Sequence, residues 1–137
     1  MKDQSQEDMI TTGYRGLDDE HHMQMELLDA FTRAVAAGRD PDAIDEILDR
    51  LIDYTKVHFS SEQLLMRLYQ YPRFQDHLED HDQTIERLQE LRAAYVAGDR
   101  TLTLETADAL GEALRSHIHS SDRALGHFLV RLGVGPG

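Results

Sequence analysis

Three short breaks divide most of this chain into four long stretches of helical character. Apolar residues recur at helical spacing from about residue 17 to 37, from 41 to 70, from 74 to 97, and from 101 or 103 to 132. No segment shows the alternation of apolar and polar residues that is typical of a strand. Because the connections are short, consecutive helices should run antiparallel. The sequence therefore predicts an all-α fold, an up-down-up-down four-helix bundle.

The ends of these stretches carry recognisable stop and start signals. Gly38 and Gly98 are suited to end the first and third helices. Asp40 is suited to cap the second helix, with Pro41 at its first position. A Tyr-Pro pair at 71–72 ends the second helix, because the residue before proline disfavours helical geometry.

One domain with two irregular ends follows from these signals. Residues 1–16 are predicted to form an N-terminal arm, residues 17–132 the bundle, and residues 133–137 a flexible C-terminal tail. Either Thr101 or Thr103 is suited to cap the fourth helix.

Composition excludes several classes of function. The 137 residues include no cysteine, which excludes disulfides, thiolate metal sites, iron–sulfur clusters and cysteine nucleophiles. The net charge of −12 argues against nucleic acid or an anionic membrane as a partner. No apolar run approaches the roughly 20 residues that cross a membrane, and the polar N-terminal segment lacks the apolar core of a signal peptide. We therefore expect a cytoplasmic protein.

Five histidines and two carboxylates have the spacing of one shared metal site. His58 and Glu62 are four residues apart, as are His77 and His81, so each pair lies on one helix face. Imidazole suits iron, zinc, copper and nickel. The full candidate set is His21, His58, Glu62, His77, His81, His117 and Asp122.

The three breaks bring these side chains to one level of the bundle. The break at 40–41 lies midway between His21 and the pair on the second helix. The break at 71–72 lies close to midway between the pairs on the second and third helices. Gly98 lies midway between the third-helix pair and His117 with Asp122. At about 1.5 Å per residue, the mismatches amount to no more than one helical turn, and unrelated histidines would not register in this way three times.

The pair on the fourth helix fits less neatly. His117 and Asp122 are five residues apart, which places them about 140° apart around a regular helix. Either Asp122 bridges two metals while His117 binds one from the side, or the helix widens locally and brings the two together. The sequence leaves both alternatives open.

These segments resemble the hemerythrin family, and in particular its single-domain bacterial form, the bacteriohemerythrins. The segment TTGYRGLDDEHH resembles the family's opening helix, and HFSSEQLLM resembles its H-F-x-x-E-x-x-x-M segment. YPRFQDHLEDH is similar to Y-P-x-x-x-x-H-x-x-x-H, and HIHSSD to H-I-x-x-x-D. Order and spacing agree from about residue 11 to 122, nearly the whole chain.

The resemblance implies a non-haem pair of iron ions (Fe2+ or Fe3+) with a bridging hydroxide or oxo group. One iron would take His77, His81 and His117, the other would take His21 and His58, and Glu62 and Asp122 would bridge the two. The second iron is then five-coordinate, and this family binds O2 there reversibly, as hydroperoxide. The resemblance thus implies a protein that stores, delivers or senses O2 rather than an enzyme.

Four residues at the right heights would line an O2 pocket: Phe59, Leu114, Ile118 and Gln24. Two positions depart from the family pattern. Gln24 stands where the family usually has an apolar residue, and Ala113 stands where it usually has tryptophan. A smaller wall and a polar group could admit water or protonate bound peroxide. We therefore expect faster autoxidation than in a typical oxygen carrier.

Other histidines and one tyrosine near the candidate set have alternative roles. His22 is an alternative ligand to its neighbour, although the register of the TTGYRGLDDEHH segment favours His21. His119 is predicted to be solvated, and His127 to lie at the surface or in an interface. Tyr54, one turn before His58, is suited either to the outer shell of the site or to the core.

The sequence excludes some alternatives to O2 binding and leaves others open. No histidine has glutamate three residues before it, as carboxylate-rich ferritin-like sites require, and HExxH is absent. The alternatives that remain are a redox-sensing or oxygen-sensing domain, a peroxidase, ferroxidase or nitric oxide-reactive enzyme using the same site, and a bundle that holds zinc, manganese or nothing. Azide, nitric oxide and peroxide are further candidate ligands, and a monomer is consistent with the sequence.

Overall fold

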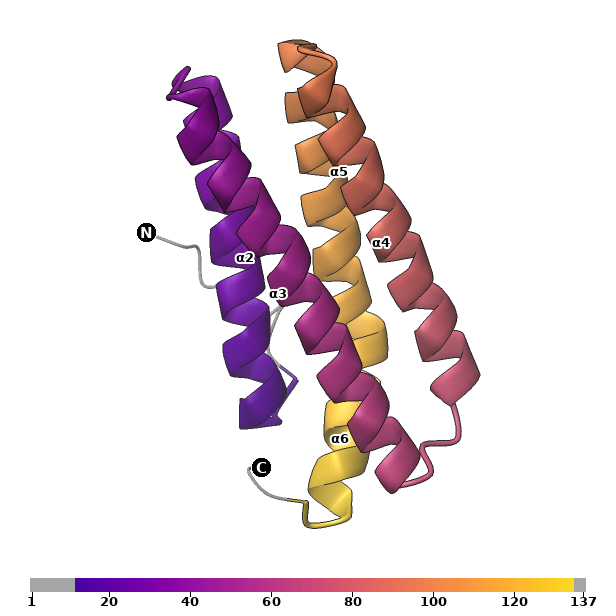
Figure 1. Ribbon diagram of the computed structural model, residues 1–137. Coiled ribbons are helices and arrows are strands. Elements are labelled where there is room, and N and C mark those ends of the chain that lie inside the picture. The colour runs from indigo at the N-terminus through magenta and orange to yellow at the C-terminus, as the bar shows by residue number, and fades with distance from the viewer. Residues whose placement is uncertain (1–11, 135–137) are drawn as a thin grey trace.

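The computed structural model describes residues 12–134, which form a bundle of four antiparallel helical columns (Figure 1). The first three columns are α2 (Arg15–Ala36), α3 (Pro41–Leu68) and α4 (Phe74–Val96). The fourth column consists of α5 (Arg100–His117), a π-helical segment η1 (Ile118–Asp122) and α6 (Arg123–Arg131). The predicted all-α bundle is confirmed.

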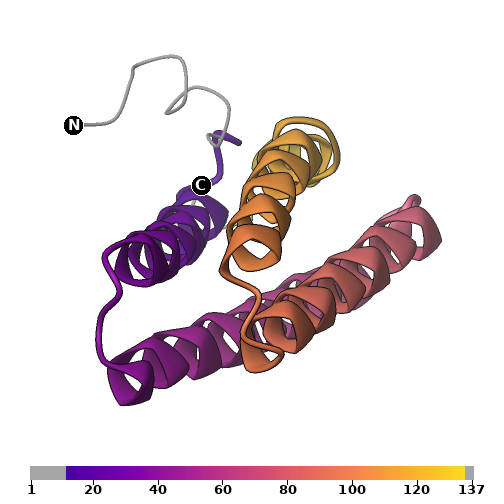
Figure 2. The same cartoon turned by 90° about the horizontal axis from the view of Figure 1, so that it is seen from above.

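The helices pack as a ring in which each column contacts two neighbours. α2 packs on α3 and α5, and α4 packs on α3 and α5. The view along the bundle shows the same arrangement, with the connections joining neighbouring helices rather than crossing the bundle (Figure 2). This is the up-down-up-down order that short connections favour. None of the described helices is both long and apolar enough to span a membrane.

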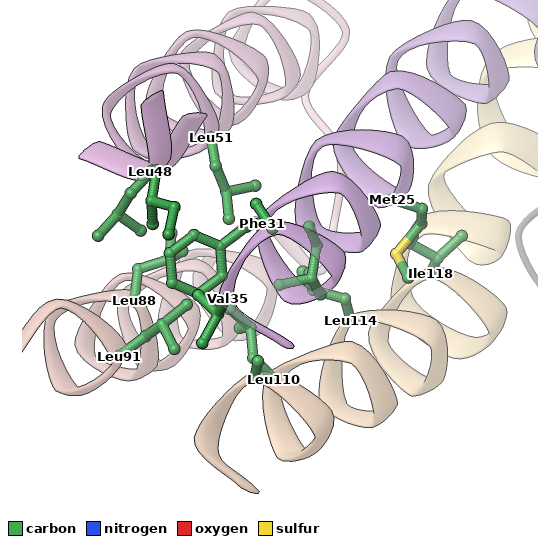
Figure 3. Close-up of a cluster of buried hydrophobic side chains, with 14 residues drawn as sticks. Met25, Phe31, Val35, Leu48, Leu51, Leu88, Leu91, Leu110, Leu114 and Ile118 are labelled. Carbon is green, nitrogen blue, oxygen red and sulfur yellow. The ribbon is translucent and has the colours of Figure 1, made fainter. Parts of the chain in front are cut away.

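Two hydrophobic clusters fill the bundle, one on each side of the level of the predicted ligands. The larger cluster includes Phe31, Leu51, Leu91 and Leu110, all fully buried (Figure 3). The smaller one, nearer the turn between α3 and α4, consists of Tyr14, Leu17, Met66, Tyr71, Leu125 and Leu129. The predicted ligands occupy the helical turns between these two clusters. The polar layer is therefore closed by apolar side chains above and below.

The predicted helix ends agree with the structure to within two residues for the first three helices. Gly38 and Gly98 adopt φ of +66° and +78° just after α2 and α4, the left-handed conformation in which glycine commonly ends a helix. Asp40 precedes α3 with Pro41 at the first position, as predicted, but its side chain makes no capping hydrogen bond.

The predicted cap of the fourth helix was wrong. Asp99 is the cap residue, because its Oδ1 accepts a hydrogen bond of 3.0 Å from the backbone N–H of Leu102. Thr101 and Thr103 lie inside α5, and the Thr103 hydroxyl donates to the backbone carbonyl of Asp99. The helix therefore begins one residue before the first threonine.

Hydrogen bonds to Asp18 of α2 hold Thr12 and Gly13, the residues before the helix, against the bundle. The Asp18 carboxylate accepts hydrogen bonds from the backbone N–H and the hydroxyl of Thr12, both at 2.7 Å, and from the N–H of Gly13 at 3.3 Å. Thr12 in turn lies against Gly126 of α6, where an added Cβ would come within 2.8 Å of the threonine Cβ. The predicted arm and tail fall mainly on residues 1–11 and 135–137, outside the described residues.

Candidate metal centre

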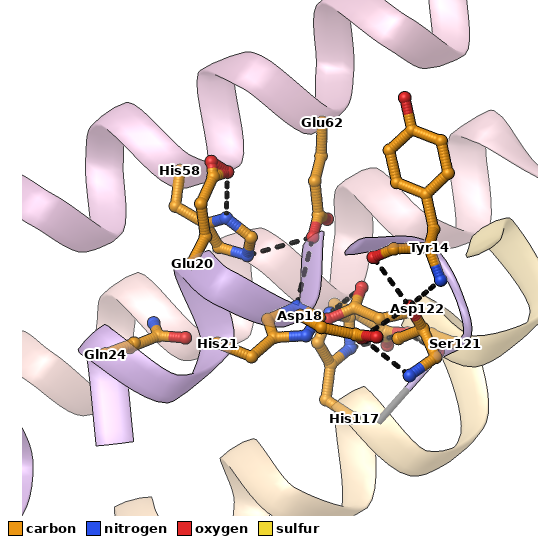
Figure 4. Close-up of polar contacts among 12 residues, drawn as sticks. Tyr14, Asp18, Glu20, His21, Gln24, His58, Glu62, His117, Ser121 and Asp122 are labelled. Atoms are coloured by element: carbon orange, nitrogen blue, oxygen red, sulfur yellow. Dashed lines mark hydrogen bonds and ion pairs between the residues drawn. The ribbon is translucent and has the colours of Figure 1, made fainter. Parts of the chain in front are cut away.

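All seven predicted side chains meet in one buried layer of the bundle. Their ligating atoms form two groups, and within each group these atoms lie within 4.8 Å of one another. The first group is Glu62, His77, His81, His117 and Asp122; the second is His21, His58, Glu62 and Asp122. Figure 4 shows several of these side chains pointing toward one another from different helices. Both carboxylates belong to both groups.

Glu62 presents one oxygen to each set of histidines. Its Oε1 lies 2.8 Å from Nε2 of both His77 and His81 on α4. Its Oε2 lies 2.9 Å from Nε2 of His58 and 3.4 Å from Nε2 of His21. The carboxylate therefore spans the gap between the two groups.

Asp122 divides its oxygens in the same way. Its Oδ1 lies 2.8 Å from Nε2 of His77 and 3.1 Å from Nε2 of His117, whereas its Oδ2 lies 2.8 Å from Nε2 of His21. The two carboxylates thus flank one central space from α3 and from the end of η1. Each turns one oxygen toward a three-histidine side and the other toward a two-histidine side.

The π-helical segment explains the five-residue spacing on the fourth column. Residues Ile118–Asp122 form η1, directly after His117. A π segment adds residues to a turn and so moves side chains five apart onto one face. Of the two alternatives that the sequence left open, local widening of the helix is the one observed.

The polar atoms in the central space are buried and lack hydrogen-bond partners. A buried polar atom without a partner costs free energy unless an ion or a water satisfies it. The unpartnered atoms that belong to the cluster are His21 Nδ1 and Nε2, His58 Nε2, His117 Nε2, Glu62 Oε2, and Asp122 Oδ1 and Oδ2. All but the first are atoms that the predicted scheme uses as metal ligands. Nitrogen and carboxylate donors of this kind fit one or two transition-metal cations.

The raised pKa values of three histidines also indicate a site for a cation. Burial lowers the pKa of His21, but the carboxylates of Asp122 and Glu62, 2.8 and 3.4 Å from its Nε2, outweigh burial and raise the pKa to about 9. The charge of Glu62 similarly outweighs burial at His58, whose pKa rises to about 10. Hydrogen bonds to both carboxylates raise the pKa of His77 to about 10 as well. The layer therefore attracts positive charge, which a proton or a metal ion can supply.

The carboxylates are held in their charged form. Burial raises the pKa of Glu62, but the charge of His58 and hydrogen bonds from the histidines hold it well below its usual value. Burial and Glu62 also raise the pKa of Asp122, but His117 and His21 outweigh them and hold it below its usual value. Two negative charges are thus fixed in an otherwise apolar interior.

A set of outer partners that sequence reasoning missed contacts the far side of the histidines. His58 Nδ1 lies 2.8 Å from Oε1 of Glu20 on α2, and His81 Nδ1 lies 3.4 Å from the side-chain amide of Gln63 on α3. A hydrogen bond at the outer nitrogen fixes the tautomer and the ring orientation of a ligating histidine. At His58 the Glu20 carboxylate accepts the proton of Nδ1, so Nε2 faces inward as an acceptor for a cation.

The third outer partner is Asp80. Its Oδ2 lies 3.6 Å from His117 Nδ1 and accepts a hydrogen bond of 2.8 Å from Ser121. Each outer partner is the sequence neighbour of a ligand on its own helix: Glu20 precedes His21, Asp80 precedes His81, and Gln63 follows Glu62. One position along a helix is about 100° around it, so the side chain reaches a histidine on the adjacent helix. This adjacency is the signal that could have identified them.

The predicted pocket residues are all buried. Phe59 stacks on His81, with ring centroids 3.8 Å apart and planes 6° from parallel, while Leu114 and Ile118 belong to the larger hydrophobic cluster. Gln24 is 1% exposed and donates a hydrogen bond of 3.0 Å from its amide to Oγ1 of Thr55, which is 0% exposed. Thr55 is a residue that the sequence analysis missed.

The remaining candidates lie outside the cluster. The ring of His22 is turned away, with Nδ1 2.8 Å from the backbone carbonyl of Asp18, so His21 is the residue that enters the site. His119 and His127 are exposed. Tyr54 is half-buried, and its pKa is raised by burial and by the charge of Glu20, which places it near an outer partner.

Comparison with known proteins gives consistent matches over most of the chain. The family model described as hemerythrin HHE cation binding domain matches residues 12–129. The chain is 30% identical over 116 residues to a bacteriohemerythrin of Pseudomonas paraeruginosa, covering 85% of this chain and 74% of that protein. It is 28% identical over 109 residues to a bacteriohemerythrin of Methylococcus capsulatus, covering 80% and 82%. No solved structure gives a significant match.

Proposed function

The chain belongs to the hemerythrin family, and we propose that it binds a pair of iron ions and, through them, O2 in a reversible manner. In this proposal His77, His81 and His117 would hold one ion, His21 and His58 would hold the other, and Glu62 and Asp122 would bind both. Storage, delivery and sensing of O2 all use such a site, so the proposal concerns the binding step that they share.

One observation carries this proposal: two unequal groups of histidines share both carboxylates. The three-histidine side and the two-histidine side each receive one oxygen from Glu62 and one from Asp122. An ion on the two-histidine side therefore has one protein ligand fewer. An open position on a metal is what a small exogenous ligand needs.

Iron would supply the electrons on which reversible O2 binding depends. The protein would supply a dry enclosure with two fixed negative charges. The two carboxylates offset half of the charge of two divalent cations, which lowers the cost of burying them. The two hydrophobic clusters close the layer on both sides and keep bulk water from the open side.

The wall of the proposed O2 pocket is mostly apolar. Phe59 is held in place by stacking on His81, and Leu114 and Ile118 pack in the larger cluster. An apolar wall offers no proton to a bound ligand, which favours release of O2 unchanged. These contacts support binding over chemical conversion.

A second candidate function rests on the buried pair of Gln24 and Thr55. Gln24 lies one turn from His21 on α2, and Thr55 lies one turn from His58 on α3, so the pair is next to the two-histidine side. Its amide and hydroxyl are polar groups in a wall that is otherwise apolar. They favour an enzyme that reduces peroxide or reacts with nitric oxide at the same site.

The test is an optical titration of the whole protein. We would load the metal-free protein with ferrous iron under anaerobic conditions, measure iron per chain, admit O2 and then remove it. We expect about two irons per chain, from the two groups of ligands, and a visible absorption band that forms with O2 and disappears when O2 is removed. Irreversible oxidation on the first exposure would refute reversible binding and favour the enzyme.

A matched pair of variants separates the site from general effects. His58→Ala removes a ligand of the two-histidine side, whereas His127→Ala removes an exposed histidine outside the cluster. The first should abolish the O2-dependent band, and the second should leave it unchanged. A persistent band in His58→Ala would contradict the assignment of His58.

A further inference from the structure

The seven proposed ligands are enclosed, and the most exposed of them lines a cavity. Six of the side chains are 0–2% exposed, whereas His117 is 9% exposed. A metal ion that enters the folded protein must pass a side chain at the edge of the layer. His117 offers the wider edge, because its cavity is about 310 Å³, whereas the cavity that His77 lines is about 50 Å³.

The cavity that reaches His117 lies between α4 and the fourth column. It has a volume of about 310 Å³ and is open to solvent, with Asp80, Arg87, Ala113, Ser116 and Ser121 among its lining residues. A cation with six waters occupies roughly 180 Å³ at about 30 Å³ per water, so a hydrated ion fits. Ala113 sits one turn before His117, and its small side chain leaves this space unfilled.

Charge in the cavity favours a cation beside His117. Asp80 is 40% exposed, and its Oδ2 lies 3.6 Å from His117 Nδ1. The carboxylate is thus in contact with solvent on one side and with a proposed ligand on the other. Arg87 is the basic residue in the lining, and it lies seven residues further along α4, about 10 Å at 1.5 Å per residue. The net charge of −12 adds a general attraction for cations.

The backbone changes geometry at the same point. α5 ends at His117, and η1 begins at the next residue. The hydrogen bonds change there from the α pattern to the wider π pattern, in which the N–H of Arg123 bonds to the carbonyl of Ile118. His117 therefore lies both at the junction of the two patterns and at the edge of the cavity.

We propose that the cavity lined by Ala113 is the entry route for divalent metal ions, with Asp80 as the first residue to bind the ion and His117 as the ligand that passes it inward. This inference rests on the proposed metal centre. It adds a path and two residues, Ala113 and Asp80, that are not ligands in the final site. The route governs the rate of loading, whereas the affinity of the loaded site depends on the seven enclosed ligands and on their outer partners, Asp80 among them.

The experiment measures loading of the metal-free full chain with cobalt(II), whose absorption reports binding. Stopped-flow mixing gives the rate, and the final absorbance gives the amount of metal bound. Ala113→Trp fills the cavity, and Asp80→Asn removes the charge but keeps an acceptor for Ser121. We expect each variant to load at least about tenfold more slowly, a barrier higher by about 1.4 kcal/mol, and to reach the same final absorbance as the wild type once cobalt(II) is saturating.

Two control variants match these changes outside the cavity. Ala109→Trp adds the same ring to an exposed position of α5, and Glu79→Gln removes one negative charge from an exposed position of α4. Both should load at the wild-type rate. If Ala113→Trp fails to fold, as judged by circular dichroism, the loading rates of Asp80→Asn and Glu79→Gln are compared instead. Slower loading in Asp80→Asn alone would then support the route, and equal rates would overturn it.

The outcomes for the route and for the centre are distinguishable. Wild-type rates in both Ala113→Trp and Asp80→Asn, or equal slowing in the controls, would overturn the entry route while leaving the metal centre intact. A wild-type protein that binds no cobalt would refute the metal centre itself, and the route with it.

Discussion

The hydrogen bond between Gln24 and Thr55 allows a quantitative test of how a polar pair is accommodated beside the metal layer. Both side chains are buried, and the donor–acceptor distance is 3.0 Å. Removing one partner of a buried hydrogen bond costs about 1–3 kcal/mol, because the other is left unsatisfied. Replacing both partners by apolar groups of similar shape is close to neutral.

The two single variants should differ in how much free energy of unfolding they lose. In Gln24→Leu the Thr55 hydroxyl can turn to a carbonyl of its own helix, so we expect a loss of about 1 kcal/mol, the lower end of that range. In Thr55→Val the buried Gln24 amide loses its acceptor and has no local substitute, so we expect about 2–3 kcal/mol. The double variant should cost no more than about 1 kcal/mol, against a sum of about 3–4 kcal/mol for the single losses, which corresponds to a coupling energy of about 2–3 kcal/mol.

Urea unfolding of the metal-free protein, followed by circular dichroism, measures these free energies. Additive losses in the double variant would refute the reasoning, since they would mean that the two groups do not satisfy one another. The same Gln24→Leu variant tests the expectation of fast autoxidation. Loaded with iron, it should hold the O2-dependent absorption band for longer than the wild type, and an unchanged lifetime would remove Gln24 as the cause.

Three further predictions follow from other contacts. Gly126→Ala should destabilise the protein by about 1–3 kcal/mol, because its Cβ would come within 2.8 Å of the Thr12 Cβ. Gly111→Ala should not destabilise it, because the added Cβ meets ordinary contacts at 3.5 Å. Thermal unfolding of the two variants measures the difference. Glu20→Gln should weaken metal binding by about ten- to a hundredfold in a chelator competition, because the carboxylate that orients His58 is lost. The three histidines whose pKa is raised to about 9 or 10 bind protons more tightly in the folded chain than in the unfolded chain. The metal-free protein should therefore lose stability as the pH rises from about 6.5, the ordinary histidine pKa, to about 10. Metal uptake at pH 7 should release protons that a pH indicator detects.

Helix order and the level of the site were predictable because both depend on counting. Helical rise is fixed, so the positions of the breaks at Gly38 and Gly98 determine which residues of antiparallel helices lie side by side. The same counting placed all seven ligands in one layer. It required no knowledge of side-chain conformation.

The missed features depend on side-chain conformation and on neighbouring helices. Asp99 rather than a threonine caps α5 because its carboxylate meets the N–H of Leu102, a choice among three suitable residues that spacing does not decide. The partner of Gln24 was missed because Thr55 belongs to another helix and carries no motif. The π-helical geometry of η1 was one of two alternatives, and only the backbone distinguishes them.

The positions of the ligands along the chain have a consequence for the order in which the protein folds. Glu62 is only 15 residues from His77 and 19 from His81, so a hairpin of α3 and α4 brings these three side chains together by local contacts. The contact of His58 with Glu20 spans 38 residues and closes a much longer loop. Short loops close before long ones, and a nascent hairpin already offers two imidazoles and a carboxylate. The four helical columns of the site are thus not equivalent in folding, because the α3–α4 part of the metal layer can form before the first and last helices close it.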